Sequence, residues 1–232
     1  MSDANLVLAS GSPRRRELLT LLGVPFQTVT PQVDESRLPG EPPPVYVTRL
    51  SQLKAREAAR LLDQPALVLA ADTIVALGDD LLGKPRDADH ARAMLARLRG
   101  RGHAVYSAIT LLDMAPNHEV TDLAAIEVPM RDYGDDEVEA YITTGDPFDK
   151  AGGYAIQHRG FNPVAAMSGC YAGVMGLPLC HLLRSLRALG HVWDDLLAQV
   201  PPACQAHLDY DCLVTADVLD GAPGGHPHTS GL

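Results

Sequence analysis

Residues 6–16 read Leu-Val-Leu-Ala-Ser-Gly-Ser-Pro-Arg-Arg-Arg, and this stretch decides how the chain starts to fold. The apolar run predicts a strand, the small residues predict a turn, and Pro13 suits the first position of a helix, where its missing N–H costs nothing. A strand, a small-residue turn and a helix N-terminus together make an anion site. Three arginines in the first helical turn oppose the helix dipole unless an anion is bound, and guanidinium groups fit phosphate oxygens. A phosphate site and a solvated basic helix start are therefore the two alternatives at this point.

The composition is that of an ordinary globular chain. It has 232 residues, of which 46% are hydrophobic and 21% charged, enough for one large domain or two small ones. No apolar run approaches the roughly 20 residues of a membrane span, and the first residues lack the pattern of a secretory signal. The four cysteines have no CxxC spacing, which argues against a zinc site or a disulfide scaffold. We therefore expect a cytoplasmic protein with no membrane partner, whose first two cysteines are small core residues.

The net charge of −10 is distributed unevenly. Residues 191–232 contain six aspartates and neither lysine nor arginine. Removing those six from the 29 acidic residues leaves 23 against 19 basic residues, so the rest of the chain is only mildly acidic. This argues against a nucleic-acid surface and allows a small anionic ligand. We predict one domain over residues 1–190 and an acidic extension over 191–232, which carries one short helix and is disordered beyond Leu219.

Hydrophobic periodicity gives the expected elements. Helices are predicted over residues 13–22 and 44–62, after Asp87 up to Gly100, from Asp135 or Asp136 through Tyr141, and over 178–189. Strands are predicted over residues 6–9, 67–77, 105–114 and 124–130, with a turn at 78–80 and a return strand at 81–82. Because these elements do not alternate strictly and include a hairpin, they indicate an α/β fold with a mixed sheet.

Charged residues interrupt this apolar pattern at several points. Asp72 lies inside the apolar run, where a carboxylate is costly without a partner, a metal or a cleft, so it is either a structural aspartate or a metal ligand or general base. Lys84 is held in a Gly-Lys-Pro turn and Lys150 in a rigid polar loop, whereas Lys54 on a helix would ordinarily be solvated. Gln157 follows an apolar pair and either ends a strand or reads the edge of a base. Basic groups and carboxylates at element ends suit a polyphosphate with a divalent metal.

Seven segments, taken together and in order, resemble the Maf family of nucleotide pyrophosphatases over residues 6–190. They are Ala-Ser-Gly-Ser-Pro-Arg-Arg-x-Glu-Leu-Leu (9–19), Val-Asp-Glu (33–35), Lys-Ala-Arg (54–56), Ala-Asp-Thr-Ile-Val (71–75), Gly-Lys-Pro (83–85), Asp-Lys-Ala-Gly-Gly-Tyr-Ala-Ile-Gln (149–157) and Gly-Leu-Pro-Leu (176–179). The resemblance implies a Maf/Ham1-like α/β fold, with a mixed twisted sheet flanked by helices and a cleft between two lobes. It further implies hydrolysis of a nucleoside triphosphate to the monophosphate and pyrophosphate with magnesium or manganese. Members of the family are often dimers, so the resemblance also suggests a homodimer.

The resemblance also assigns roles to residues. Asp72 matches the family's proton acceptor, and Arg14, Thr73 and Gln157 match positions that select the base. The 149–157 segment resembles the branch of the family that acts on dTTP and UTP. From these matches we expect the following set. Ser10, Ser12, Arg14 and Arg15 hold phosphates, Lys54 and Lys84 neutralise developing charge, Glu35 and Asp72 hold the metal, and Thr73, Lys150 and Gln157 complete the substrate site.

Two other functions fit the same residues. One is hydrolysis of modified nucleotides, which keeps the chemistry and changes the substrate. The other is a nucleotide-binding regulator of cell division, in which the same groups bind without relevant turnover.

Overall fold

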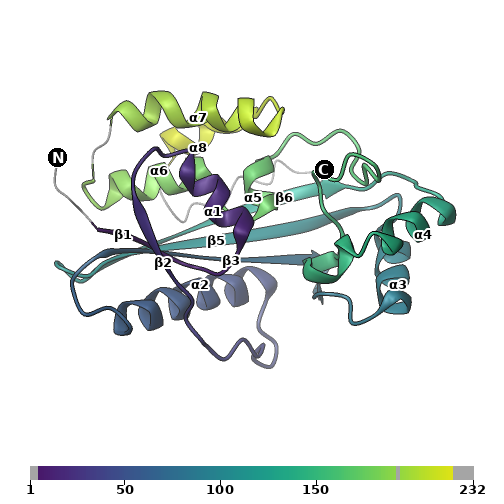
Figure 1. Cartoon of the computed structure of the whole chain (residues 1–232), viewed down its shortest axis with the longest axis horizontal. Helices are drawn as coiled ribbons and strands as arrows, with labels where there is room; N and C mark the ends of the chain where they lie inside the picture. Colours follow the sequence, from purple (N-terminus) through teal and green to yellow (C-terminus); the bar gives the residue numbers. More distant parts are fainter. Residues whose placement is uncertain (1–4, 192–193, 222–232) are drawn as a thin grey trace.

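The computed structural model describes residues 5–191 and 194–221, which form a mixed sheet with helices on both faces (Figure 1). The strands are β1 (Leu6–Ala9), β2 (Phe26–Val29), β3 (Leu67–Leu77), β4 (Asp80–Leu82), β5 (Gly102–Asp113) and β6 (His118–Pro129). They lie in the order β2-β1-β3-β5-β6, and β4 pairs with β3 beyond the end of β1. Strand β1 runs parallel to β2 and β3, whereas the other pairs are antiparallel. The predicted α/β class with a mixed sheet is confirmed.

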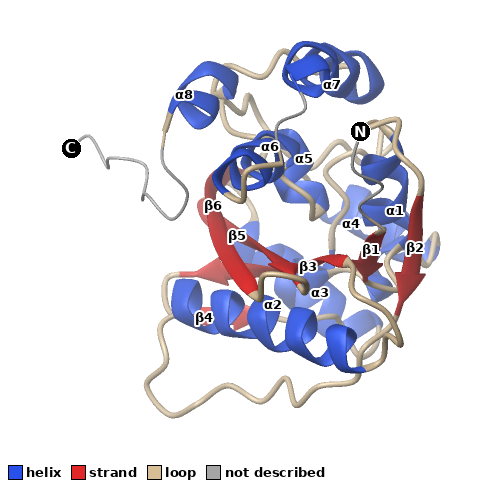
Figure 2. Cartoon of the chain, turned by 90° about the vertical axis from the view of Figure 1, so that its left-hand side faces the viewer, coloured by secondary structure: helices blue, strands red, loops and turns tan. Residues whose placement is uncertain are grey.

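The helices divide between the two faces of the sheet. They are α1 (Pro13–Thr20), α2 (Pro43–Arg60), α3 (Ala88–Leu98), α4 (Asp135–Thr143), α5 (Tyr171–Met175), α6 (Leu179–Ala188), α7 (Asp194–Leu208) and α8 (Thr215–Asp220), with two short 3₁₀ helices, η1 (Asp146–Asp149) and η2 (Ala151–Gly153). Figure 2 shows α2 on one face and α6 on the other, with α7 and α8 outside α6. Helices α3 and α4 lie together at one end of the long strands (Figure 1). No helix in the described ranges is long and apolar enough to span a membrane.

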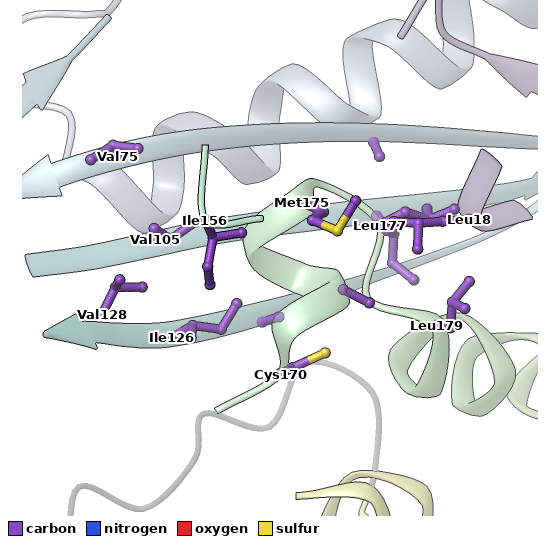
Figure 3. Packing of buried hydrophobic residues seen from close by; sticks show 14 of the residues in the cluster. Leu18, Val75, Val105, Ile126, Val128, Ile156, Cys170, Met175, Leu177 and Leu179 are labelled. Carbon is purple, nitrogen blue, oxygen red and sulfur yellow. The ribbon is translucent and has the colours of Figure 1, made fainter. Parts of the chain in front are cut away.

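The core is aliphatic and follows the two-residue period of β3. Leu67 and Leu69 pack with the main cluster on the α6 side, whereas Val68 and Ala70 pack with the alanines of α2 on the other side. Figure 3 shows part of the main cluster, where Met175 of α5 lies over the strands near Ile156. Because both faces of β3 are covered, its sequence is almost continuously apolar, which explains why the strand could be predicted to the residue.

The predicted element boundaries hold within a few residues for most elements. The helix predicted over 13–22 ends at Thr20, since residues 21–22 form a turn and Gly23 has a positive φ of 68°. Asp87 caps α3 as expected by accepting a hydrogen bond from the backbone N–H of His90. Strand β6 begins six residues earlier than predicted, at His118, because its pairing with β5 continues over polar residues.

Four parts of the chain differ from the prediction. The short edge strand β2 and the short helix α5 were not expected, and the loop predicted over 145–153 contains η1 and η2. The extension carries two helices, α7 and α8, in place of one short helix. Helix α8 continues through Asp220, and the rest of the predicted disorder falls on residues 222–232, outside the described residues.

Candidate active site

The site lies where β1 ends and leaves one edge of β3 open. Strand β1 pairs with β3 only as far as Ala9 and Ala70, and β4 joins the same edge only from Val75 onward. Residues 71–74 therefore face a space bounded by the turn after β1 and the N-terminus of α1, which is where ligands bind in open sheets with parallel strands. A cavity of about 1070 Å³ occupies this position, and it lies between the part with α1 and α2 and the part with η1 and η2.

The cavity brings together every residue that the sequence predicted for the site. Its lining includes Ser10, Ser12, Arg14, Arg15, Glu35, Lys54, Asp72, Thr73, Lys84, Lys150 and Gln157. These residues come from six separate stretches of the chain, so their convergence is a property of the fold. Their individual roles stay predictions.

Lys54, Asp72 and Glu35 form the most compact charged cluster of the cavity. The Lys54 ammonium Nζ lies 2.5 Å from Asp72 Oδ1 and 2.8 Å from Glu35 Oε1. The Lys54 side chain is only 13% exposed, so the expectation of an ordinary solvated lysine is wrong. The partner that the buried Asp72 carboxylate needs is therefore Lys54. An ammonium has three donors, and these carboxylates take two of them.

Tyr46 supports this cluster, and it was absent from the predicted site. Its hydroxyl donates to the backbone carbonyl of Glu35 at 2.7 Å, which positions the loop that carries the carboxylate. Burial raises the pKa of Tyr46, and the charges of Asp72 and Glu35 raise it further, so the hydroxyl keeps its proton. The signal was present in the sequence, because residues 46, 50 and 54 share one face of α2, and all three line the cavity.

The arginine turn is organised around Arg15. Its guanidinium donates from Nε to the Gly176 carbonyl at 3.0 Å and from Nη2 to Thr73 Oγ1 at 3.2 Å. A longer contact of 3.4 Å reaches Ser10 Oγ. Ser12 caps α1 by accepting from the backbone N–H of Arg15. Arg15 thus connects α1, β3 and the end of α5, and it shapes the wall of the cavity in addition to lining it.

The two neighbouring arginines differ from Arg15 and from each other. Arg14 is half-buried and lines the cavity, whereas Arg16 is exposed and lies outside the lining. Burial lowers the pKa of Arg15; the Asp72 carboxylate opposes this shift and the Arg14 charge adds to it. Two adjacent cations at a helix N-terminus favour an anion there. Of the two readings of the basic turn, the anion site fits Arg14 and Arg15, and the solvated helix start fits Arg16.

Lys150 lies on the other side of the cavity and is held within its own loop. Its Nζ donates to the Asp146 carbonyl at 2.8 Å, to Asp146 Oδ1 at 2.9 Å and to Asp149 Oδ1 at 2.5 Å. These three bonds use all three donors of the ammonium, so Lys150 contacts a phosphate only by giving one of them up. Asp146 and Asp149 were not among the predicted site residues, although their spacing of four and one residues from Lys150 is a local signal.

The turn that carries Lys84 is joined to the Lys150 loop. Gly152 donates its N–H to the carbonyl of Gly83 at 3.1 Å, and Lys84 is exposed at the edge of the cavity. Gly152 has a φ of 75°, and a Cβ there would lie 3.1 Å from Val75 on β3. Only glycine allows this close packing of the loop against the strand. The two cationic turns are therefore built as one unit over the end of β3.

Gln157 follows this unit in a turn and is exposed at the cavity. Residues 155–157 are not part of a strand, so the alternative that Gln157 ends a strand is wrong. Its amide is free to reach a ligand in the cavity, and its use in reading a base stays a prediction.

With this geometry established, comparison with known proteins places the chain in a family. The family model described as "Maf-like protein" matches residues 5–189. The chain belongs to the Maf family. The dTTP/UTP pyrophosphatase of Syntrophotalea carbinolica is 44% identical over 208 residues, 89% of this chain and 93% of that protein. The dTTP/UTP pyrophosphatase of Methylococcus capsulatus is 45% identical over 200 residues, 86% of this chain and 98% of that protein.

A more distant similarity is found among solved structures. A HAM1 protein from Coxiella burnetii aligns with a TM-score of 0.42 and 17% identity, covering 56% of this chain and 74% of that chain. The Maf assignment rests on the sequence matches, and this weaker structural similarity adds no argument to it.

The carboxylates of this Maf protein fit a divalent metal only together with a substrate. Among the described residues, no group of three or more His, Cys, Asp or Glu side chains is arranged to hold a metal ion. Asp72 and Glu35 nevertheless converge on one cation, the Lys54 ammonium. Magnesium is often bound by one or two carboxylates plus phosphate oxygens and water, which matches this donor set.

Proposed function

We propose that this Maf protein hydrolyses dTTP and UTP to the monophosphate and pyrophosphate. The observation that carries the proposal is the Lys54–Asp72–Glu35 cluster, which lines one large cavity together with the Arg14–Arg15 turn. A carboxylate that could accept a proton therefore lies in the same cavity as an anion site, as hydrolysis of a phosphoanhydride requires. The relatives named dTTP/UTP pyrophosphatase, which match over most of the chain, support the choice of substrate.

The triphosphate would bind at the start of α1. The Arg14 guanidinium lines the cavity at that helix end and would bind phosphate oxygens, and Lys84 adds positive charge at the edge of the cavity. Arg15 would hold the wall in place through Thr73 and Gly176. Phosphoryl transfer needs little covalent chemistry from a protein, so positioning and charge carry most of the catalysis.

Asp72 would activate the attacking water. The water oxygen forms a bond to the α-phosphorus, the bond from that phosphorus to the bridging oxygen breaks, and the proton of the water passes to Asp72. Pyrophosphate leaves as a stable anion, so no strong protein acid is required. Lys54, which has one donor left beside Asp72 and Glu35, would stabilise charge on the phosphoryl oxygens.

We further propose that the activity needs a divalent metal, magnesium or manganese. When bound, such an ion supplies neutralisation of phosphate charge and polarisation of the reacting group. Glu35 and Asp72 would hold it, because their oxygens already converge on a single cation. Gln157 would read the base, since an amide offers a donor beside an acceptor, as the edge of a pyrimidine does.

The experiment is a substrate panel with the purified full chain. Equal concentrations of dTTP, UTP, dCTP, GTP and modified pyrimidine triphosphates are incubated with magnesium, with manganese and with a chelator, and monophosphate and pyrophosphate are measured. We expect kcat/KM for dTTP and UTP at least ~10-fold above that for the other canonical nucleotides, and loss of turnover with the chelator. A preference for a modified nucleotide, or tight binding without pyrophosphate release, would contradict the proposal.

Several predictions about the whole molecule stand beside this one. We propose that the enzyme is cytoplasmic and that its chain consists of a core domain over residues 1–190 and an extension over 191–232. We also propose that it forms a homodimer, and light scattering coupled to size-exclusion chromatography would test this oligomeric state. The family match over residues 5–189 supports the core.

A further inference from the structure

All four cysteines, which are spread over residues 170–212, meet beside α5. Cys170 immediately precedes α5, Cys180 lies in α6, Cys204 lies in α7, and Cys212 lies in the loop before α8. They line one small cavity of about 10 Å³, room for roughly one water. The first two belong to the segment that matches the family and the last two to the segment that follows it. The four thiols therefore mark the junction between these two parts of the chain.

Within this cluster, Cys170 and Cys212 interact most strongly with each other. The Cys170 thiol is the largest cause of the lowered pKa of Cys212, and Cys212 is the largest cause of the raised pKa of Cys170. Burial of Cys212 opposes this shift, whereas hydrogen bonding to the backbone of Val214 and to the side chain of Thr215 adds to it. Burial raises the pKa of Cys204 to about 12, by contrast. Cys204 and Cys212 are partly exposed, whereas Cys170 and Cys180 are buried. Of the two partly exposed thiols only Cys212 has a lowered pKa, so we expect it to react first with a reagent.

The position of Cys170 completes the arrangement. Figure 3 shows its sulfur at the start of α5, on the side that faces away from the strands. The side chain caps α5 by accepting from the Gly173 N–H at 3.3 Å. Tyr210, two residues before Cys212, donates to two carbonyl groups just before α5, at 2.8 and 2.9 Å. These bonds hold the Cys212 loop against the Cys170 thiol.

We propose that Cys170 and Cys212 are a redox-active pair that closes into an intramolecular disulfide on reaction with a small-molecule disulfide. The Cys212 thiolate attacks one sulfur of the reagent, forms a mixed disulfide and releases one thiolate. The Cys170 thiol then loses its proton and attacks the Cys212 sulfur, which releases the second thiolate. Two protein thiols are oxidised to one disulfide, and the reagent disulfide is reduced to two thiols. Both cysteines are free in the structure described here.

The disulfide joins the C-terminal segment to a wall of the substrate cavity. Cys170 begins α5, and the carbonyl of Gly176 just after α5 accepts the hydrogen bond from Arg15. His207 Nε2 of α7 also lies 3.2 Å from Glu17 Oε1 of α1. The C-terminal segment therefore already contacts α1, in addition to its contacts near the start of α5. The bond makes these contacts permanent under oxidising conditions and reversible under reducing ones.

A metal site is the competing use of four cysteines. Within residues 5–191 and 194–221 the thiols are not arranged to hold a metal ion, whereas Cys170 and Cys212 line one small cavity and interact with each other, which suits a disulfide. The two uses can also be distinguished by measurement, because a metal site would leave a metal ion bound to the purified protein and its thiols unreactive.

The test compares the full-length wild type with Cys212→Ser and with Cys204→Ser, a matched control from the same cavity. Each protein is incubated with glutathione disulfide, remaining thiols are alkylated, and the peptides are analysed by mass spectrometry. We expect one disulfide between the peptides of Cys170 and Cys212 in the wild type and in Cys204→Ser, reversed by dithiothreitol. It should be absent from Cys212→Ser, and modification of wild-type Cys204 should be at least ~10-fold slower.

Circular dichroism of the reduced variants checks that they fold, and Cys170→Ala serves as a second variant that removes the pair. The proposal is overturned if Cys212 stops at a stable glutathione adduct, if the disulfide joins other cysteines, or if the purified protein carries one bound zinc per chain that protects the thiols. None of these readouts depends on turnover, so the result is independent of the proposed activity.

Discussion

Two lysines line the same cavity, each between two carboxylates, yet they are built in opposite ways. Lys54 bonds to Asp72, which lies 18 residues away on another element, and to Glu35 in a distant loop. Lys150 bonds to Asp146 and Asp149, four and one residues away in the same loop. The Lys54 cluster forms only once the helix and the sheet have packed, whereas the Lys150 cluster is local.

The two clusters also differ in what they leave free for a ligand. The local cluster uses all three ammonium donors and fixes the shape of the loop that leads to Gln157. The long-range cluster leaves one donor of Lys54 unused and presents two carboxylates to a cavity. We infer that the Lys54 end of the cavity carries out the chemistry and the Lys150 end holds the part that recognises the base.

The largest effect is expected from Asp72→Asn. The amide keeps the shape of the carboxylate but does not take a proton from water, so kcat for dTTP should fall by ~10²–10⁴-fold. Initial rates of pyrophosphate release give kcat, and thermal unfolding checks that the variant is folded.

Asp149→Asn is the matched control, because it changes a carboxylate that bonds to the other lysine. We expect its kcat to stay within about threefold of the wild type, since Asp149 is an exposed partner in a local ion pair. Equal losses in the two variants would remove the distinction between the two ends of the cavity.

The lysines themselves give the next effect when each is replaced by methionine. Lys54→Met should lower kcat/KM by about 10–100-fold, because it removes a charge beside the reacting phosphate. Lys150→Met should mainly destabilise the fold, by about 1–3 kcal/mol, since the half-buried Asp146 carboxylate then loses its cationic partner and keeps only the hydrogen bond from Tyr141. Steady-state kinetics and urea unfolding of both variants separate the two outcomes, and the reverse pattern would contradict the comparison.

How far the sequence predicts this molecule also depends on whether a signal is local. The run 67–77 predicts β3 because it is apolar on both faces, and Asp72 stands out within it. The pairing of Asp72 with Lys54 was not predictable, since it requires the packing of α2 on the sheet and the point at which β1 ends. The Lys150 pairs, by contrast, join residues four and one positions apart, so their sequence spacing is sufficient to predict them.

The elements that the sequence did not predict, β2 and α5, are stabilised mainly by packing against the rest of the fold. Strand β2 has four residues, of which none is fully buried, so no hydrophobic pattern marks it. Helix α5 has five residues, and a Cβ at its Gly173 would lie 2.6 Å from Ile126 of β6. That helix exists because a glycine lets it approach the strand closely, which a helix propensity does not report.

Gln157→Ala should change selectivity more than rate. Loss of a hydrogen bond to the base is expected to lower the ratio of kcat/KM for dTTP to that for GTP by about tenfold, with kcat within about threefold. Gln32→Ala, which removes another exposed amide of the same cavity, is the control and should leave the ratio unchanged. If Lys150 positions the loop that leads to Gln157, Lys150→Met should lower the same ratio. If neither Gln157→Ala nor Lys150→Met changes the ratio, this loop does not take part in base recognition.

The smallest effect is the pH dependence of the local cluster. Burial raises the pKa of Asp146, but hydrogen bonds from Tyr141 and Lys150 outweigh it, so the pKa lies below its usual 3.8. A carboxyl with a lowered pKa stabilises the fold fully above the unfolded value, and this contribution is lost as the pH falls through the folded value. Urea unfolding between about pH 6 and about pH 3 should therefore show a shallower acid loss in Asp146→Asn than in the wild type. If the two proteins lose stability with falling pH in the same way, the ionised Asp146 carboxylate does not stabilise the Lys150 loop. The hydrogen bonds from Lys150 to the Asp146 carbonyl and to Asp149 would then hold the loop.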